Sequence, residues 1–130
     1  MIVDASAILA VLLKEPERQL FSNLLNEGPE RAALSPVNYL EVALRVDRGD
    51  IPGASEQLDT ILAYMNVELA DITPEQAKLA REAYAKFGKG NHRAKLNLGD
   101  CFAYALAKAR REPLLFKGDD FRHTDVEAAL

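Results

Sequence analysis

Four acidic residues occupy places in the sequence where a solvated surface acid is not expected. Asp4 directly follows a short apolar segment at the N-terminus, and Asp119 follows a second such segment near the C-terminus. Glu41 lies among the apolar residues of a predicted helix, and Asp100 stands near the start of another helix, among small and aromatic residues. Carboxylates that share one pocket raise one another's pKa, so they stay ionised together only beside a cation. The four acids therefore predict a site for Mg²⁺, or alternatively Mn²⁺, since these hard ions prefer oxygen ligands.

Each of these acids also has an ordinary structural explanation, which for Asp119 is the polar turn that commonly follows a strand. Asp4 could cap the helix that follows it, and Asp100 could belong to a capping pattern with Asn97. Glu41 could form a simple helix ion pair with Arg45, one turn further along. Each explanation accounts for one acid alone, and none accounts for several acids meeting in one place.

The elements that must position these acids are short apolar segments alternating with amphipathic ones. This alternation predicts a three-layer α/β/α domain with a short central parallel sheet of four to five strands. The carboxyl ends of parallel strands meet at one edge of a sheet, where such sheets bind ligands, so the acids should converge there. Strands are predicted at residues 1–3, 32–34, 67–69 and 113–116, with a further edge strand at 126–130; helices are predicted at 6–13, 17–27, 36–48, around 58–65, at 74–87 and after Asn97.

Composition limits the class of protein further. The chain has 130 residues, of which 48% are hydrophobic, and its formal net charge is −4. This length predicts one domain over residues 1–130. The single Cys101 excludes an internal disulfide and is typical of a reducing compartment. The acidic balance argues against a purely electrostatic binder of nucleic acid, but not against an enzyme that holds metal ions.

Each of the four acids belongs to a longer segment, and the segments follow one another along the chain: IVDAS at residues 2–6, NYLEV at 38–42, LNLGDCFAYALA at 96–107 and LFKGDDF at 115–121. Together they resemble the motifs of PIN-domain ribonucleases, and most closely those of the VapC-type toxins of type II toxin–antitoxin systems. The resemblance covers nearly the whole chain, and the third segment is the most specific. Lys117 departs from the pattern, because many relatives carry Thr or Ser before the Gly-Asp pair.

The resemblance implies a metal-dependent endoribonuclease that hydrolyses phosphodiester bonds and acts as a toxin. Asp4, Glu41, Asp100 and Asp119 would be both the catalytic residues and the metal ligands, although Asp120 could replace its neighbour. A metal-activated water would attack phosphorus in line and leave a 5′-phosphate and a 3′-hydroxyl.

Five further residues are candidates for contact with the substrate: Ser6, Asn38, His92, Arg93 and Lys117. Ser6 could bind a metal water or a phosphate oxygen, and Asn38 could orient the acid one helical turn later. His92 and Arg93 belong to a basic, glycine-containing loop whose cations could contact phosphates.

The resemblance also implies partners: an RNA substrate, a cognate antitoxin and a second copy of the chain. Two pairs of apolar residues are candidates for the dimer face, Leu20 with Leu24 and Leu58 with Leu62. The longest apolar run is too short to span a bilayer and lacks a preceding basic segment, so the expected location is cytoplasmic, without membrane contact.

Two other functions remain open from the residues alone. An aspartate-based phosphotransfer domain also carries an Asp after its first strand, but it requires a second acid at the position that Ser6 occupies. A non-catalytic PIN-like module that only binds RNA or protein would need none of the four acids, and their joint presence argues against it.

Overall fold

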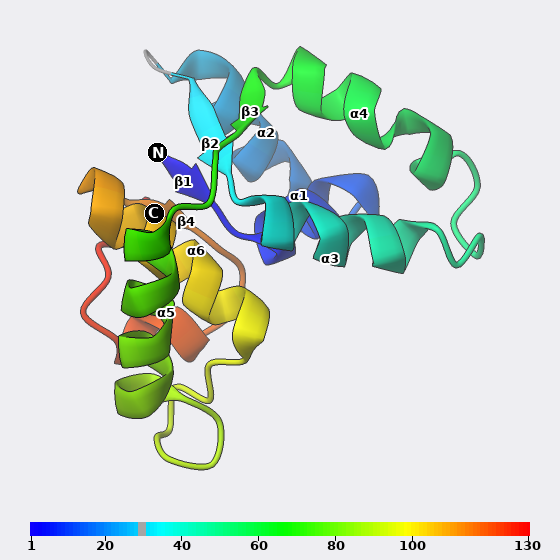
Figure 1. Ribbon diagram of the computed structural model, residues 1–130. Coiled ribbons are helices and arrows are strands. Elements are labelled where there is room, and N and C mark those ends of the chain that lie inside the picture. Colours follow the sequence, from blue (N-terminus) through cyan, green and yellow to red (C-terminus); the bar gives the residue numbers. More distant parts are fainter. Residues whose placement is uncertain (29–30) are drawn as a thin grey trace.

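The computed structural model describes residues 1–28 and 31–130. In this part of the chain, four short strands form one parallel sheet in the order β3-β2-β1-β4. Figure 1 shows the helices packed around this sheet. The elements are β1 (Ile2–Val3), α1 (Ala5–Leu12), α2 (Arg18–Glu27), β2 (Ala32–Leu34), α3 (Pro36–Val46), α4 (Ala54–Tyr64), β3 (Val67–Leu69), α5 (Pro74–Phe87), α6 (Leu98–Arg110), β4 (Leu114–Leu115) and the short 3₁₀ helix η1 (Asp120–His123).

Each face of the sheet packs against its own group of helices. Successive strand residues point to opposite faces. Val3 and Leu115 therefore join the core formed with α1 to α4, whereas Ile2 and Leu114 join the core formed with α5 and α6. The predicted three-layer α/β fold is confirmed by this arrangement.

Local sequence signals set the starts of the helices that carry the candidate acids. Asp4 and Asn97 accept hydrogen bonds from backbone N–H groups of α1 and α6, as helix caps do. Pro36 occupies the first turn of α3, where its missing N–H costs nothing. The first β–α connection is a single residue, so Asp4 stands directly between a buried strand and a helix.

Some predicted details differ from the structure. The segment 126–130 does not form a strand; it makes one isolated parallel bridge, between Ala128 and Leu114. At the start of α5, the Thr73 hydroxyl accepts the backbone N–H of Gln76 at 3.1 Å, but the capping box that the Thr-x-x-Gln pattern allows is only half formed: the Gln76 side-chain amide donates to the carbonyl of Asp71 at 3.2 Å. The C-terminal segment pairs with β4 at one position only, which is too few for a strand, and the Gln76 side chain has a competing backbone acceptor five residues earlier in the chain.

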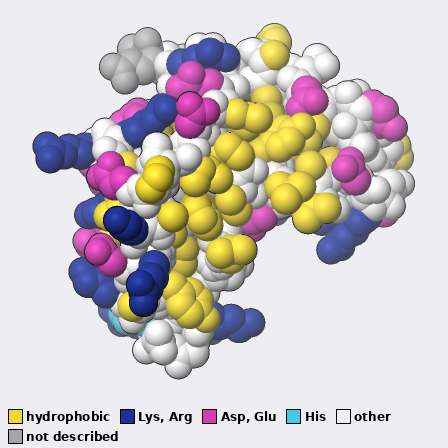
Figure 2. All heavy atoms as spheres, viewed as in Figure 1, with side chains coloured by type: hydrophobic (Ala, Val, Ile, Leu, Met, Phe, Trp, Pro, Cys, Tyr) yellow, Lys and Arg dark blue, Asp and Glu magenta, His cyan; other side chains and the backbone are white. Residues whose placement is uncertain are grey.

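The prediction that Leu58 and Leu62 could form a dimer face is wrong, because both side chains are buried in the core that α4 shares with α1 and α3. Other large hydrophobic side chains are exposed, and Figure 2 shows a hydrophobic surface that runs across α3 and on toward α5 and α6. No helix among the described residues has the length and the hydrophobicity that crossing a membrane requires.

Candidate active site

Asp4 is held at the carboxyl end of β1, at the start of α1. Its Oδ2 accepts a hydrogen bond from the backbone N–H of Ser6 at 3.0 Å. Asp4 is buried, with only 5% of its surface exposed. Burial raises the pKa of Asp4 to about 6, against the lowering effect of the Ser6 hydrogen bonds, and the charge of Glu41 raises it further. Capping and burial therefore act together on this carboxylate.

Glu41 lies on α3 and faces the first turn of α6. The Asn38 amide donates to Glu41 Oε1 at 2.8 Å and to the carbonyl of Gly99 at 3.0 Å. A Cβ atom at Gly99 would overlap both carboxylate oxygens of Glu41, so the glycine leaves the space that this carboxylate occupies. Burial raises the pKa of Glu41, the Asn38 hydrogen bond lowers it, and the charge of Asp100 raises it.

The ordinary explanation for Glu41, an ion pair with Arg45, is wrong. Arg45 pairs with Asp50 at 2.9 Å. The neighbouring Leu40 and Leu44 are exposed, so the apolar stripe predicted around Glu41 is not a core face. What buries Glu41 is α6, which packs against α3.

Asp100 is the third residue of α6, and it serves as a cap and as a candidate ligand at once. The backbone N–H of Asn97 donates to Asp100 Oδ2 at 3.0 Å, and the backbone N–H of Asp100 donates to Asn97 Oδ1 at 2.9 Å. This is the reciprocal capping box that the sequence allowed. Burial raises the pKa of Asp100 to about 6; the Asn97 hydrogen bond lowers it, and the charges of Asp4 and Asp120 raise it.

The loop after β4 offers two candidates for the fourth acid, Asp119 and Asp120. Both residues follow Gly118, whose φ of +98° allows the turn after β4. Both are exposed, and Asp120 is the one whose charge acts on Asp100. The role predicted for Asp119 stays a prediction, and Asp120 becomes the stronger candidate for the fourth position.

Three acids thus form a closed electrostatic triangle. Glu41 raises the pKa of Asp4, Asp100 raises that of Glu41, and Asp4 raises that of Asp100. Their carboxylate oxygens are the ligands that a hard divalent cation prefers. The positive charge of such a cation would also offset the repulsion among the three carboxylates. In the part of the chain that the structure describes, no three Asp, Glu, His or Cys side chains are already drawn together tightly enough to hold a metal.

Ser6 and Lys117 connect the first and last motifs. The Ser6 hydroxyl accepts a hydrogen bond from the backbone N–H of Lys117 at 2.9 Å, which ties the loop after β4 to the start of α1. The Lys117 ammonium pairs with Glu15 and with Glu17, the latter at 3.2 Å. These contacts give both residues a structural role, and their predicted contact with substrate stays a prediction.

His92 and Arg93 lie in the loop between α5 and α6. The His92 Nδ1 accepts the backbone N–H of Ala94 at 3.0 Å, and its ring packs edge-on against Phe87 at 5.2 Å between ring centres. Arg93 is exposed. The loop is thus ordered by its histidine, while the arginine side chain reaches into solvent.

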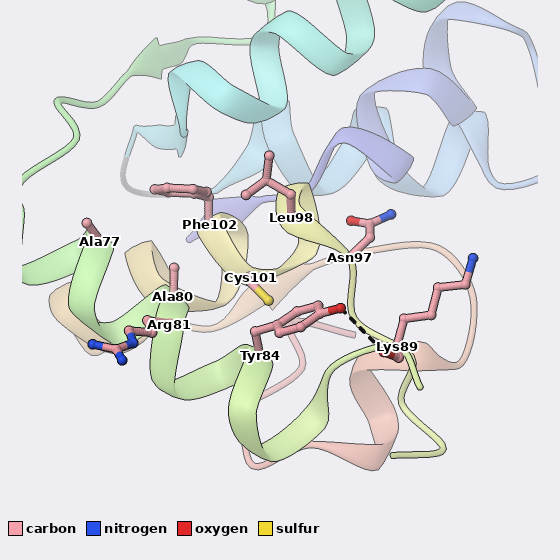
Figure 3. A pocket seen from close by; sticks show the side chains of 9 residues that line it. All are labelled: Ala77, Ala80, Arg81, Tyr84, Lys89, Asn97, Leu98, Cys101 and Phe102. Atoms are coloured by element: carbon pink, nitrogen blue, oxygen red, sulfur yellow. Dashed lines mark hydrogen bonds between the residues drawn. The ribbon is translucent and has the colours of Figure 1, made fainter. Parts of the chain in front are cut away.

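Two features of this region were not found from the sequence. One is the fit of Glu41 against Gly99, which joins residues far apart in the chain. The other is a pocket of about 590 Å³ between α5 and α6. Figure 3 shows Tyr84 of α5 and Phe102 of α6 among the side chains that line it. The apolar spacing of each helix signalled a buried face, but only the packed pair reveals a gap between them.

A family comparison identifies the class of protein that this fold and site define. The family model described as "PIN domain" matches residues 1–127. The chain therefore belongs to the PIN-domain family, which confirms the resemblance drawn from its motifs.

The relatives of this chain narrow the class further. It is 46% identical over 129 residues to "Ribonuclease VapC" of Mycolicibacterium smegmatis, covering 98% of each chain. It is also 46% identical over 127 residues to "Ribonuclease VapC30" of Mycobacterium tuberculosis, covering 97% of this chain and 95% of the relative.

Solved structures agree on the fold. Mycobacterium tuberculosis VapC20, described as a sarcin-ricin loop cleaving toxin, matches with a TM-score of 0.76 at 14% identity and covers 96% of this chain and 95% of its own. VapBC2 from Rickettsia felis, bound to a DNA fragment from its promoter, matches with a TM-score of 0.72 at 16% identity and covers 98% and 95%.

Proposed function

We propose that this protein is a metal-dependent endoribonuclease and the toxin of a type II toxin–antitoxin pair. The observation that carries the proposal is the triangle of Asp4, Glu41 and Asp100, whose charges raise one another's pKa. Sequence similarity over nearly the full length of VapC ribonucleases supports the same activity.

Neutral donors orient the three acids. Backbone N–H groups hold Asp4 and Asp100, and the Asn38 amide holds Glu41. Within residues 1–28 and 31–130, no Lys or Arg forms an ion pair with any of the three. Their negative charge is therefore available to a cation from solution.

Asp4, Glu41 and Asp100, with Asp120 or Asp119, would hold Mg²⁺ or Mn²⁺. Such an ion supplies a lowered pKa for a bound water and positive charge opposite the phosphate. The chain's own task is to keep the carboxylates fixed: Asn38 holds the acid of α3 against the backbone of α6, and the capping box holds the acid of α6.

The loop before α6 supplies positive charge for an RNA backbone. Lys89, Arg93 and Lys95 are exposed there, directly before the helix that carries Asp100. Cations beside an acidic site let a phosphodiester approach a chain whose net charge is −4. We propose that these side chains contact phosphates that flank the cleaved bond.

A cognate antitoxin and a second copy of the chain are the protein partners that we propose. Two of the similar solved structures are described as a toxin–antitoxin complex from Klebsiella pneumoniae and as VapBC2 from Rickettsia felis. An RNA substrate and the free, buried Cys101 are consistent with the cytoplasmic location expected from the sequence.

The test is cleavage of RNA by purified protein with Mg²⁺, with Mn²⁺ and with EDTA. Asp4→Asn keeps the helix cap and removes the charge, so it should reduce cleavage by at least about 100-fold. Asp71→Asn, at an exposed position outside the site, is the matched control and should cleave normally. Sequencing of the RNA ends should find 5′-phosphates.

Two results would reject the proposal. Undiminished cleavage by folded Asp4→Asn protein would remove the acid triangle from the mechanism. RNA binding without cleavage under any metal condition would favour the non-catalytic module.

A further inference from the structure

The Ser35 side chain is buried at the carboxyl end of β2, where α3 begins. Ser35 is 1% exposed and occupies the N-cap position of the helix. A serine at this position normally accepts a hydrogen bond from a backbone N–H of the first turn, as Asp4, Thr73 and Asn97 do at the starts of their helices. Within residues 1–28 and 31–130, the Ser35 hydroxyl makes no such bond. It is therefore a buried polar group without the usual capping role.

The first turn of α3 holds a second buried oxygen without a partner. Among the residues that the structure describes, four buried side-chain oxygens lack a hydrogen bond, and two of them are Ser35 Oγ and Asn38 Oδ1. Asn38 is fully buried and is the third residue of the helix, a position whose side chain lies within reach of the N-cap residue, as in a capping box. Buried polar atoms in native proteins are nearly always hydrogen-bonded, either directly or through an ordered water. Two such oxygens on one helical turn therefore indicate one shared link.

The strand register places Ser35 beside Asp4, on the side of the sheet that α6 covers. Ile2 of β1 pairs with Ala33 of β2, so Asp4 and Ser35 are the first residues beyond two adjacent parallel strands. Ile2 and Ala33 face the core formed with α5 and α6. Side chains two positions apart on an extended chain point the same way, and the backbones of Asp4 and Ser35 are still extended, with ψ of 156° and 141°. The Ser35 hydroxyl therefore points toward the helix that carries Asp100.

Asn38 holds Glu41 through one end of its side-chain amide. Its Nδ2 donates to Glu41 Oε1 at 2.8 Å and to the carbonyl of Gly99 at 3.0 Å. Both partners are acceptors, so the amide must present its two N–H groups to them and its oxygen, Oδ1, to the other side. An amide flipped end for end would put Oδ1 against the carboxylate and lose both bonds. A donor to Oδ1 would thus select the orientation that holds Glu41.

We propose that Ser35 is a positioning residue for Glu41, and that its hydroxyl fixes the Asn38 amide through one buried water. The Ser35 and Asn38 side chains, both described by the structure, make no direct hydrogen bond. A water that accepts from the hydroxyl and donates to Oδ1 satisfies both atoms. Removing the hydroxyl releases this end of the amide and loosens the carboxylate that the other end holds. The catalytic consequence rests on the ribonuclease function proposed above, whereas the orientation of Asn38 does not.

NMR of the Asn38 side-chain amide in the metal-free protein tests the link without RNA. Its two hydrogens, assigned by their loss in Asn38→Ala, should exchange slowly with solvent in the unmodified chain, because both are bonded and buried. Ser35→Ala should accelerate this exchange about tenfold or more and lower the urea midpoint of unfolding, since Oδ1 loses its donor. Ser35→Thr keeps the hydroxyl and should exchange slowly. Ser55→Ala removes an exposed hydroxyl at the start of α4, and this matched control should leave the exchange unchanged.

Cleavage kinetics give a second measurement. Because Ser35 is buried and acts through Asn38, Ser35→Ala should lower kcat about tenfold and leave the KM for RNA unchanged. Three results would overturn the proposal: Ser35→Ala protein that exchanges the Asn38 hydrogens at the original rate, that is more stable than the unmodified chain, as loss of an unpaired buried hydroxyl would make it, or that keeps its kcat despite faster exchange. An unmodified chain that cleaves no RNA would reject the proposed function, and the exchange rates would still decide whether Ser35 fixes Asn38.

Discussion

Replacing Asp4 by Asn should stabilise the metal-free protein while it abolishes cleavage. Asn caps a helix as well as Asp does, and its amide oxygen can accept the same N–H of Ser6. The substitution therefore removes one buried charge and little else. The buried Asp4 carboxylate destabilises the fold when it is ionised. A role in binding a ligand would explain why an acid stands at this edge of the sheet.

The magnitude follows from the pKa of Asp4, which is raised from 3.8 to about 6. Because the folded protein binds this proton more tightly than the unfolded chain, the free energy of unfolding falls as the pH rises from 4 to 6 and stays low above it. The difference of about two pKa units corresponds to about 3 kcal/mol. At pH 7.5, Asp4→Asn should recover about 2–3 kcal/mol of this, and near pH 4 it should recover almost none.

Urea unfolding in EDTA at a series of pH values measures the difference between the variant and the unmodified chain. The control Asp71→Asn should show no such pH-dependent gain, since Asp71 is exposed. An Asp4→Asn protein that is no more stable than the unmodified chain at pH 7.5 would refute the argument from burial. A gain that stays the same at pH 4 would refute its electrostatic origin.

Three further outcomes follow from the site. Gly99→Ala should displace the Glu41 carboxylate, because the new Cβ overlaps its oxygens; RNA cleavage should fall about tenfold while stability changes by less than about 1 kcal/mol, and normal cleavage would show that the close fit is dispensable. Mg²⁺ should raise the melting temperature of the unmodified chain in a saturable way, and calorimetry that finds no rise would argue against a metal site. Asp120→Asn should lower the pKa of Asp100, followed by NMR of its carboxyl carbon, and should reduce cleavage more than Asp119→Asn does; the reverse order would restore Asp119 as the fourth acid.

Much of the fold could be predicted from the sequence because its signals are local. Short segments such as the apolar residues 32–34, and residues 67–69 with two apolar side chains around a glutamate, became strands with the predicted bounds. The caps at Asp4 and Asn97 set the starts of two helices through hydrogen bonds to residues two and three positions away. Once strands and helices alternate in this way, a parallel sheet follows, and the acids after its strands share one edge.

The geometry of the site depended on contacts between distant residues. The Asn38 amide reaches the Gly99 carbonyl, 61 positions along the chain, and this contact places Glu41 beside Asp100. Ser6 likewise meets the backbone of Lys117 across 111 positions. Helical spacing alone could not choose between a pairing of Glu41 with Arg45 and this cross-helix contact.

The sequence by itself determined the family, the order of the elements and the four acidic segments, because each depends on residue types at short spacing. Only the tertiary structure decided which acids act on one another, that Leu58 and Leu62 belong to the core, and that Leu40 and Leu44 remain in water. Amphipathic spacing shows that a helix has an apolar side, but packing decides whether that side meets the same chain or is left for a partner.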